Sequence, residues 1–419
     1  MLKGIVQSKQ VYSLLGVFII LIYLLSRTFM GISIFNYRIG EMVFFFLVLF
    51  LLVSIFTNPI NLIQKKIWSK KIRFTLFLLL SYFLFSVFFF KGSLSDLNIY
   101  RTSSFIWAIG FLYLSMIIFE KRKPTVIYLS TLIAMLIWIY VYNIYGVSDE
   151  IQNFLLILSD KFEYHKGSDL LIMFVATFFV ANRIINNKRI AFEIFIVYSF
   201  LYLPILLFKS RTAFLAFFIF FILEIIYFKQ SIKNQPKRNF FLFIASLLIL
   251  VQSIFIVTKS GYIQIEDIST RAEIIIDYRL TTDSQSEESF IYIKDGILYS
   301  TDGNLNWRLQ IWQDVLFDLA KTDRLLTGYG FSSTIPAMED PLRKGGDGTN
   351  ENVHNFLVNI LARGGVISLF LYGLFFFFLL TEIIKKSNNF EVLNLIVPIF
   401  ITSLFDASME NAHFPLLLY

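Results

Sequence analysis

The sequence predicts an all-α polytopic integral membrane protein. We expect about 11–12 transmembrane helices, a cytoplasmic N-terminus and one large outer loop of mixed helical and hairpin structure. Of the 419 residues, 57% are hydrophobic and 50 are Phe, and the mean hydropathy is +0.68. Only 16% are charged, against roughly 25% in a soluble domain. These apolar residues also gather in stretches long enough to cross a bilayer.

Eleven stretches qualify as membrane spans, because a spanning helix needs about 20 mostly apolar residues and somewhat fewer when flanking side chains reach the interface. They are residues 11–26, 42–62, 74–90, 104–119, 125–145, 169–184, 190–208, 212–228, 239–257, 365–381 and 391–408.

The positive charges predict the orientation of these spans. With the N-terminus inside, the inner connections hold 19 Lys and Arg, and the short outer connections hold eight. Cytoplasmic loops are enriched in Lys and Arg, so this alternation predicts a cytoplasmic N-terminus. It also explains the net charge of +7 as a topology signal. We therefore expect membrane lipids as neighbours and no nucleic-acid partner.

The longest connection, residues 258–355, divides the chain into three parts. Residues 1–257 hold nine spans, 258–355 form the outer loop, and 356–419 hold the C-terminal spans. Ordered connections of this length are uncommon and usually functional. The loop contains nine Lys and Arg but sixteen Asp and Glu, so its net charge is −7. An anion bound here would depend on individual arginines and not on general basicity.

Two segments of the loop have recognisable patterns. Residues 290–299 alternate in polarity around Asp295-Gly296, which favours a β-hairpin. Asn306 is expected to cap a helix, and Gly328-Tyr329-Gly330 to end it. Apolar residues recur along this helix at i,i+4 spacing. They are Trp307, Ile311, Val315 and Leu319, with Trp312 and Leu316 beside them.

Two arginines are candidates for binding an anion. Arg211 opens a span after Lys209-Ser210, in an outer turn too short to leave the interface. Its side chain either reaches lipid headgroups or binds an anion at that depth. Arg308 closely follows the expected helix cap, where backbone N–H groups and a guanidinium can bind one phosphate. A solvated surface arginine is the alternative interpretation for Arg308.

Three histidines are the candidates for imidazole chemistry. His354 lies where the long loop re-enters the membrane, so it could act as a general base on groups from water or from lipid. The alternative is a structural role. His165 lies in a short outer loop and has no evident chemical role. His413, near Asp406 and Glu410 at the outer end of the last span, is a secondary candidate that could instead contact headgroups.

Several other chemistries lack their sequence signatures. The absence of Cys excludes disulfides, thiolate metal sites and cysteine nucleophiles. The chain has no P-loop, zinc-protease or serine-hydrolase motif, and no carboxylate cluster spaced for a metal. We predict neither a metal site nor a cofactor. An ion-coupled transporter would place charges at mid-membrane, whereas Glu193 and Glu224 lie near the ends of their spans.

These features occur together in an informative order. The set comprises Ser210-Arg211-Thr212 opening a span, Trp307-Arg308 and Trp312 in the loop helix, Leu325-Leu326-Thr327-Gly328-Tyr329-Gly330, and His354-Asn355 before a span with Gly364-Gly365. In this order, residues 209–216 and 304–373 resemble the O-antigen ligase and O-antigen polymerase family of bacterial envelope membrane proteins. Two positions depart from that pattern: Leu325 stands where Pro is common, and Arg363 where an acidic or small residue is usual.

The resemblance implies metal-independent glycosyl transfer at the periplasmic face of the bacterial inner membrane. The donor would be a glycan on undecaprenyl diphosphate, transferred en bloc to a sugar hydroxyl. A ligase uses the lipid A core as acceptor and a polymerase uses another lipid-linked repeat unit; the sequence leaves both open. Carried over to this chain, Arg211 and Arg308 would bind the diphosphate, and His354 would activate or orient the acceptor hydroxyl. The secondary candidates are Ser210, Trp307, Asn355 and His413.

Two other functions remain as alternatives. A flippase or other transporter of lipid-linked oligosaccharide would need a charged path through the spans, which the sequence lacks. A non-catalytic assembly protein would leave the occurrence of Arg211, Arg308 and His354 in this pattern unexplained.

Overall fold

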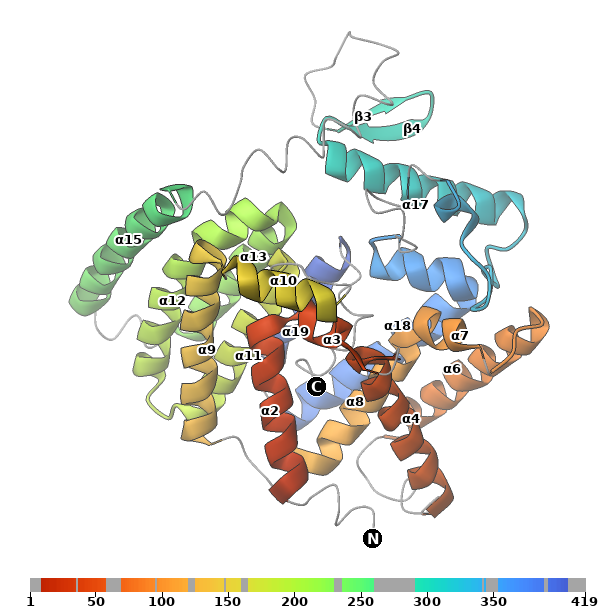
Figure 1. Cartoon of the computed structure of the whole chain (residues 1–419), viewed down its shortest axis with the longest axis horizontal. Helices are drawn as coiled ribbons and strands as arrows, with labels where there is room; N and C mark the ends of the chain where they lie inside the picture. The colour runs from red at the N-terminus through yellow and green to blue at the C-terminus, as the bar shows by residue number, and fades with distance from the viewer. Residues whose placement is uncertain are drawn as a thin grey trace.

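The structure is a computed structural model of the chain, and helices dominate it (Figure 1). It describes residues 9–34, 37–57, 69–94, 96–119, 125–146, 148–159, 165–229, 236–259, 291–340, 343, 353–387 and 391–405.

The helices of the described residues are α2 (Lys9–Leu25), α3 (Arg27–Gly31), α4 (Ile39–Thr57), α6 (Lys70–Phe89), α7 (Leu97–Thr102), α8 (Ser104–Phe119), α9 (Val126–Tyr145), α10 (Asp149–Leu158), α11 (Gly167–Ile184), α12 (Lys188–Lys209), α13 (Arg211–Tyr227), α15 (Pro236–Lys259), α17 (Gly303–Lys321), α18 (Phe356–Ser387) and α19 (Glu391–Ser403), with one 3₁₀ turn, η1 (Pro336–Met338). The strands form two antiparallel hairpins, β1 (Ser33–Ile34) with β2 (Tyr37–Arg38) and β3 (Ile291–Lys294) with β4 (Ile297–Ser300).

Each of the eleven predicted apolar stretches overlaps one of these helices. They are α2, α4, α6, α8, α9, α11, α12, α13, α15, α18 and α19. Six helices of the described residues are both long and apolar enough to cross a membrane. The chain is therefore a multi-pass, mainly helical membrane protein, and the side of the membrane on which each loop lies stays a prediction.

Phenylalanines fill the centre of the bundle. Helix α11 packs against α9, α12, α13 and α19. Its Phe174 and Phe178 are fully buried and contact Phe195 of α12, with the Phe178 and Phe195 rings 5.4 Å apart in a T-shaped arrangement. Aromatic rings bury large apolar areas and prefer edge-to-face contacts, so this part of the Phe-rich composition forms a packed core.

Helix α17 covers one end of the bundle together with the β3–β4 hairpin and α10, and α2 begins at the opposite end (Figure 1). Ile311, Val315 and Leu319 have no exposed surface and form a separate core with the following loop. The predicted amphipathic helix is thus confirmed, because its i,i+4 apolar face is the one that packs.

Both predicted ends of this helix were wrong. The cap is Asp302, whose Oδ1 accepts a hydrogen bond from Leu305 N at 2.9 Å. Asn306 lies within the first turns, and its Oδ1 accepts from Ser300 N at 3.2 Å instead. The helix ends at Lys321, before Gly328-Tyr329-Gly330. Both Asp and Asn are good caps, so only the path of the chain after β4 decides between them.

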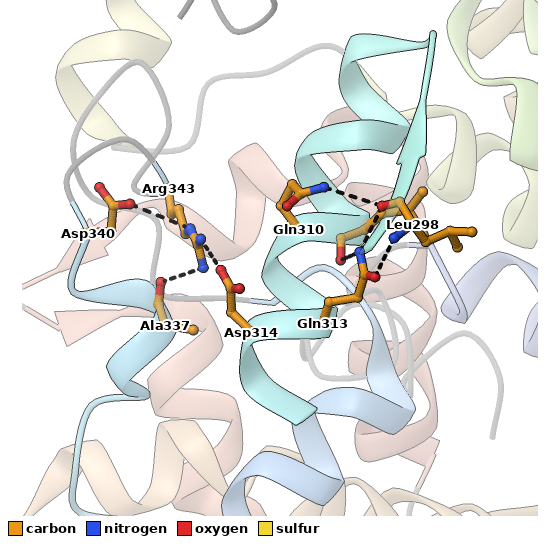
Figure 2. Close-up of polar contacts among 8 residues, drawn as sticks. Leu298, Gln310, Gln313, Asp314, Ala337, Asp340 and Arg343 are labelled. Atoms are coloured by element: carbon orange, nitrogen blue, oxygen red, sulfur yellow. Dashed lines mark hydrogen bonds and ion pairs between the residues drawn. The ribbon is translucent and has the colours of Figure 1, made fainter. Parts of the chain in front are cut away.

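The predicted hairpin is confirmed, and a glutamine joins it to α17. Asp295 and Gly296 have φ values of 52° and 77°, as a two-residue I′ turn requires. Gln313 Oε1 accepts from Leu298 N at 2.7 Å, and its Nε2 donates to Leu298 O at 2.8 Å (Figure 2). One side chain therefore satisfies both backbone groups at the free edge of β4.

The other side of α17 is joined to the following loop by Arg343. This buried side chain forms an ion pair with Asp314 of α17 and lies 3.6 Å from Asp340 (Figure 2). It also donates to Ala337 O at 3.4 Å. The guanidinium of Arg343 thus holds the loop after η1 to α17.

Helix α18 is broken at Gly365, which has a φ of 67° and a ψ of −171°. Figure 1 shows the change of direction beneath α17. The first segment precedes the predicted span, and the residues after Gly365 form the span itself. The predicted start of that span at residue 365 therefore coincides with the break.

Residues 325–330, which we call the clasp segment, fill this break. Val366 N donates to Leu325 O at 2.9 Å and Tyr329 N donates to Ala362 O at 2.8 Å. A Cβ on Gly365 would lie 2.1 Å from Leu326 O, so only glycine permits this approach. The motif at residues 325–330 and the Gly364-Gly365 pair therefore contact each other through their backbones.

The two residues before the break, Arg363 and Gly364, are joined to other parts of the fold by side-chain hydrogen bonds. Tyr82 of α6 donates its hydroxyl to Gly364 O at 2.8 Å. Arg363 is 4% exposed and donates to the carbonyl of Ser333. The unusual arginine thus satisfies a backbone acceptor inside the fold.

Candidate functional site

An ion pair joins the membrane helix α13 to the loop helix α17. Arg211 is the first residue of α13, and its Nη1 donates to Oδ2 of Asp302, the cap of α17. The Arg211 side chain is 73% exposed, whereas that of Asp302 is 22% exposed. The contact leaves other N–H donors of the guanidinium available, because arginine has five.

A ring contact joins α17 to the segment that precedes α18. The indole ring of Trp307 and the imidazole ring of His354 have centroids 5.1 Å apart and planes inclined by 55°. The buried Nε1 of Trp307 has no hydrogen-bond acceptor among the described residues. A buried donor of this kind can bind an oxygen of a ligand.

His354 has an unusual backbone conformation. Its φ is 53°, in the left-handed region, which costs a non-glycine residue roughly 1–2 kcal/mol. The residues on either side maintain it: Val353 O accepts from Trp312 Nε1 at 2.7 Å, and Asn355 Oδ1 caps α18 by accepting from Val358 N at 3.0 Å. Strain maintained by surrounding contacts is common at functional sites.

Arg308 lies on α17 just beyond the two residues that make these contacts, Asp302 and Trp307. It follows Trp307 directly, and it lies six residues after Asp302, about 9 Å along a helix that rises 1.5 Å per residue. Its side chain is partly buried. The structure therefore places Arg308 on the first turns of α17, the helix that Arg211 and His354 contact through Asp302 and Trp307.

Two secondary candidates are helix caps. Ser210 accepts from Ala213 N at 3.2 Å and so caps α13, immediately before Arg211. Its Cβ also packs closely on Gly167 of α11, where an added Cβ would be only 2.5 Å away. Asn355 has the same capping role on α18. Both side chains therefore position a neighbouring candidate residue.

The two remaining histidines differ in what the structure shows. His165 is 2% exposed, its Nε2 lies 2.9 Å from Tyr23 O, and its ring contacts that of Tyr142. Lys209 donates to His165 O at 2.9 Å. His165 is thus a buried structural residue that helps to hold the turn before Arg211. His413, with Asp406 and Glu410, lies outside the described residues.

Sequence reasoning missed Asp302, which joins Arg211 to α17. Its signal was present: an aspartate two residues after a strand and just before a Gly-Asn pair is a good helix cap. Nothing in the sequence indicated that the same carboxylate would contact Arg211, because the two residues belong to segments far apart in the chain.

Comparison with known proteins now adds to this geometry. Residues 194–373 match the family model described as O-antigen ligase. The matched range begins in α12, ends in α18 and contains Arg211, Asp302, Arg308 and His354. No curated protein and no solved structure gives a significant match.

Proposed function

From the O-antigen ligase domain that this membrane protein carries over residues 194–373, we propose that it transfers a glycan from undecaprenyl diphosphate to a sugar hydroxyl. The transfer takes place on the periplasmic side of the bacterial inner membrane, as the charge count of the loops predicts. It builds a surface polysaccharide and needs neither a metal nor a cofactor. The acceptor is a lipid A core or another lipid-linked repeat unit.

One observation carries the proposal: three distant segments meet at the first turns of α17. Arg211 reaches this helix through Asp302, Arg308 is part of it, and His354 packs on Trp307. Two arginines and a histidine at the membrane end of a loop suit a donor whose diphosphate lies at the lipid surface.

The chemistry assigns a separate role to each group. The acceptor oxygen forms a bond to the anomeric carbon, and the bond from that carbon to the phosphate oxygen breaks. His354 accepts the hydroxyl proton, and the electron pair leaves with undecaprenyl diphosphate. Arg211 and Arg308 stabilise the charge that develops on the diphosphate, at about 1.5–3 kcal/mol per charge-assisted hydrogen bond.

Trp307 and the helix caps have supporting roles in this proposal. The Trp307 ring restricts the orientation of the imidazole, and its indole N–H can donate to a sugar or phosphate oxygen. Ser210 and Asn355 begin the helices that present Arg211 and His354.

Single substitutions in the native host test the proposal. For Arg211→Ala, Arg308→Ala and His354→Ala we expect the lipid-linked precursor to be made and exposed outside but not transferred. Arg101→Ala is a matched control, because Arg101 is also an exposed arginine paired with a carboxylate, that of Glu41 at 2.6 Å. Normal surface polysaccharide from the His354→Ala strain would contradict the assignment.

Two further readouts separate the alternatives. Precursor that is made but not exposed outside would favour a flippase. In a strain that lacks the protein, bare lipid A core indicates a ligase, whereas a single repeat unit on the core indicates a polymerase. Transfer by the purified protein should continue in excess EDTA; its loss, with recovery on adding a divalent cation, would contradict the metal-independent mechanism.

A further inference from the structure

Asp302 uses its two carboxylate oxygens on two different elements. Oδ1 caps α17 by accepting from Leu305 N at 2.9 Å, and Oδ2 accepts from Nη1 of Arg211 on α13. Through one side chain, the start of the loop helix is joined to the start of a membrane helix.

Fold stability alone does not explain why an aspartate is present at this position. An ion pair with a side chain as exposed as that of Arg211 contributes little to stability, because water screens it. A carboxylate beside a diphosphate site also repels the ligand, within a loop whose net charge is already −7. An uncharged cap such as Ser or Asn would start α17 equally well.

We propose that Asp302 is a positioning residue: it holds the guanidinium of Arg211 beside the first turns of α17, so that Arg211 and Arg308 bind one diphosphate together. This inference rests on the proposed function, and it gives Asp302 a part in donor binding beyond its capping of α17. Asp302 engages one N–H of Arg211 and leaves the others for phosphate oxygens. It acts through Arg211 and does not contact the donor.

The substitution Asp302→Asn separates the two contacts. The amide oxygen of Asn still caps α17, but the amide nitrogen that replaces Oδ2 is a donor and cannot accept from Arg211. Asp302→Ser is a second variant, since its hydroxyl also caps the helix but is too short to reach the guanidinium. Both variants should keep the melting temperature of the wild-type protein.

The measurement is the affinity of the purified full-length chain in lipid nanodiscs for undecaprenyl diphosphate without sugars. We expect Asp302→Asn and Asp302→Ser to weaken binding about tenfold, because misplacing a binding group by an ångström has effects of this order or larger. In an Arg211→Ala background the same substitutions should have no further effect. This coupling distinguishes positioning of Arg211 from a general structural effect, which would appear in both backgrounds.

Three outcomes would overturn the inference. These are unchanged binding by Asp302→Asn, tighter binding, which would make Asp302 a competing counter-ion, and equal losses with and without Arg211. The proposed function fails separately: in that case Arg211→Ala alone binds undecaprenyl diphosphate as tightly as the wild-type protein.

Discussion

The indole ring of Trp307 lies 5.1 Å from the imidazole ring of His354, and five residues further along α17 the indole N–H of Trp312 binds the carbonyl of Val353 at 2.7 Å. Two tryptophans of one loop helix therefore hold the residue before the histidine and the histidine itself. Whatever moves α17 also moves His354, so the loop helix and the start of α18 form one unit.

Replacing His354 by Asn separates its chemistry from its backbone strain. Asn tolerates a φ of 53° better than most residues, so we expect a melting temperature at or above that of the wild-type protein. Loss of the proton acceptor should reduce glycan transfer by about 10²–10⁴-fold. Transfer within a few-fold of wild type, assayed with purified protein, would refute a catalytic role.

Gly365→Ala should disrupt the break in α18. The new Cβ would lie 2.1 Å from Leu326 O, and the residue would have to adopt a positive φ. We therefore expect the free energy of unfolding to fall by about 3 kcal/mol or more. Gly373→Ala is a matched control in the same helix, because the added Cβ has no atom of the described residues within 4 Å apart from its chain neighbours and its own stretch of helix backbone. That change should be neutral or stabilise the helix by about 0.5–1 kcal/mol. Thermal unfolding in detergent measures both, and similar melting temperatures would contradict the clasp.

Gln313→Ala should release the β3–β4 hairpin from α17 without unfolding the helix. It removes the hydrogen bonds to both the N–H and the carbonyl of Leu298. Together they contribute about 1–2 kcal/mol to the stability of the hairpin on α17. Hydrogen exchange at the Leu298 amide should accelerate. Gln310→Ala is the control, since its 3.3 Å bond reaches only Leu298 O and leaves the amide bonded. Equal exchange rates in both variants would show that Gln313 does not hold the hairpin.

Tyr329 should make the clasp segment sensitive to high pH. Burial raises the pKa of Tyr329 above its usual range, and the hydrogen bond that its hydroxyl donates to Asp318 raises it further. The folded-state pKa exceeds the unfolded value of about 10. The stabilisation by the protonated Tyr329 hydroxyl, which is bonded to Asp318, is therefore complete below pH 10 and is lost as pH rises through the folded-state pKa. Tyr329→Phe should cost about 1 kcal/mol at neutral pH. Melting curves should show this difference shrinking above pH 10; a constant difference would contradict the prediction.

Elements that depend on local sequence signals were predicted correctly, whereas the two ends of α17 were not. Each of the eleven apolar stretches overlaps a helix of the described residues, and the hairpin at Asp295-Gly296 has its predicted turn, since hydrophobic runs and Asp-Gly turns are local signals. The start of α17 was misplaced by four residues, from Asp302 to Asn306, because two good caps compete locally. The end of α17 was misplaced because Gly328 and Gly330 serve a distant contact with α18: Gly328 packs on the backbone of Arg363, and Gly330 N donates to Arg363 O.

The candidate site divides in the same way. Residue types and their order were enough to select Arg211, Arg308 and His354 and to indicate the family whose model matches residues 194–373. Composition and charge likewise determined that the chain is a multi-pass membrane protein. These conclusions depend only on side-chain chemistry and on periods of a few residues.

Only the tertiary structure decided which contacts hold those residues together. The double use of Asp302, the Trp307–His354 ring contact and the clasp segment in the break at Gly365 all join segments that are distant along the chain. Such contacts have no local sequence pattern, because packing of whole helices brings the partners together. The sequence therefore determined which groups are present, and the fold determined which of them act on one another.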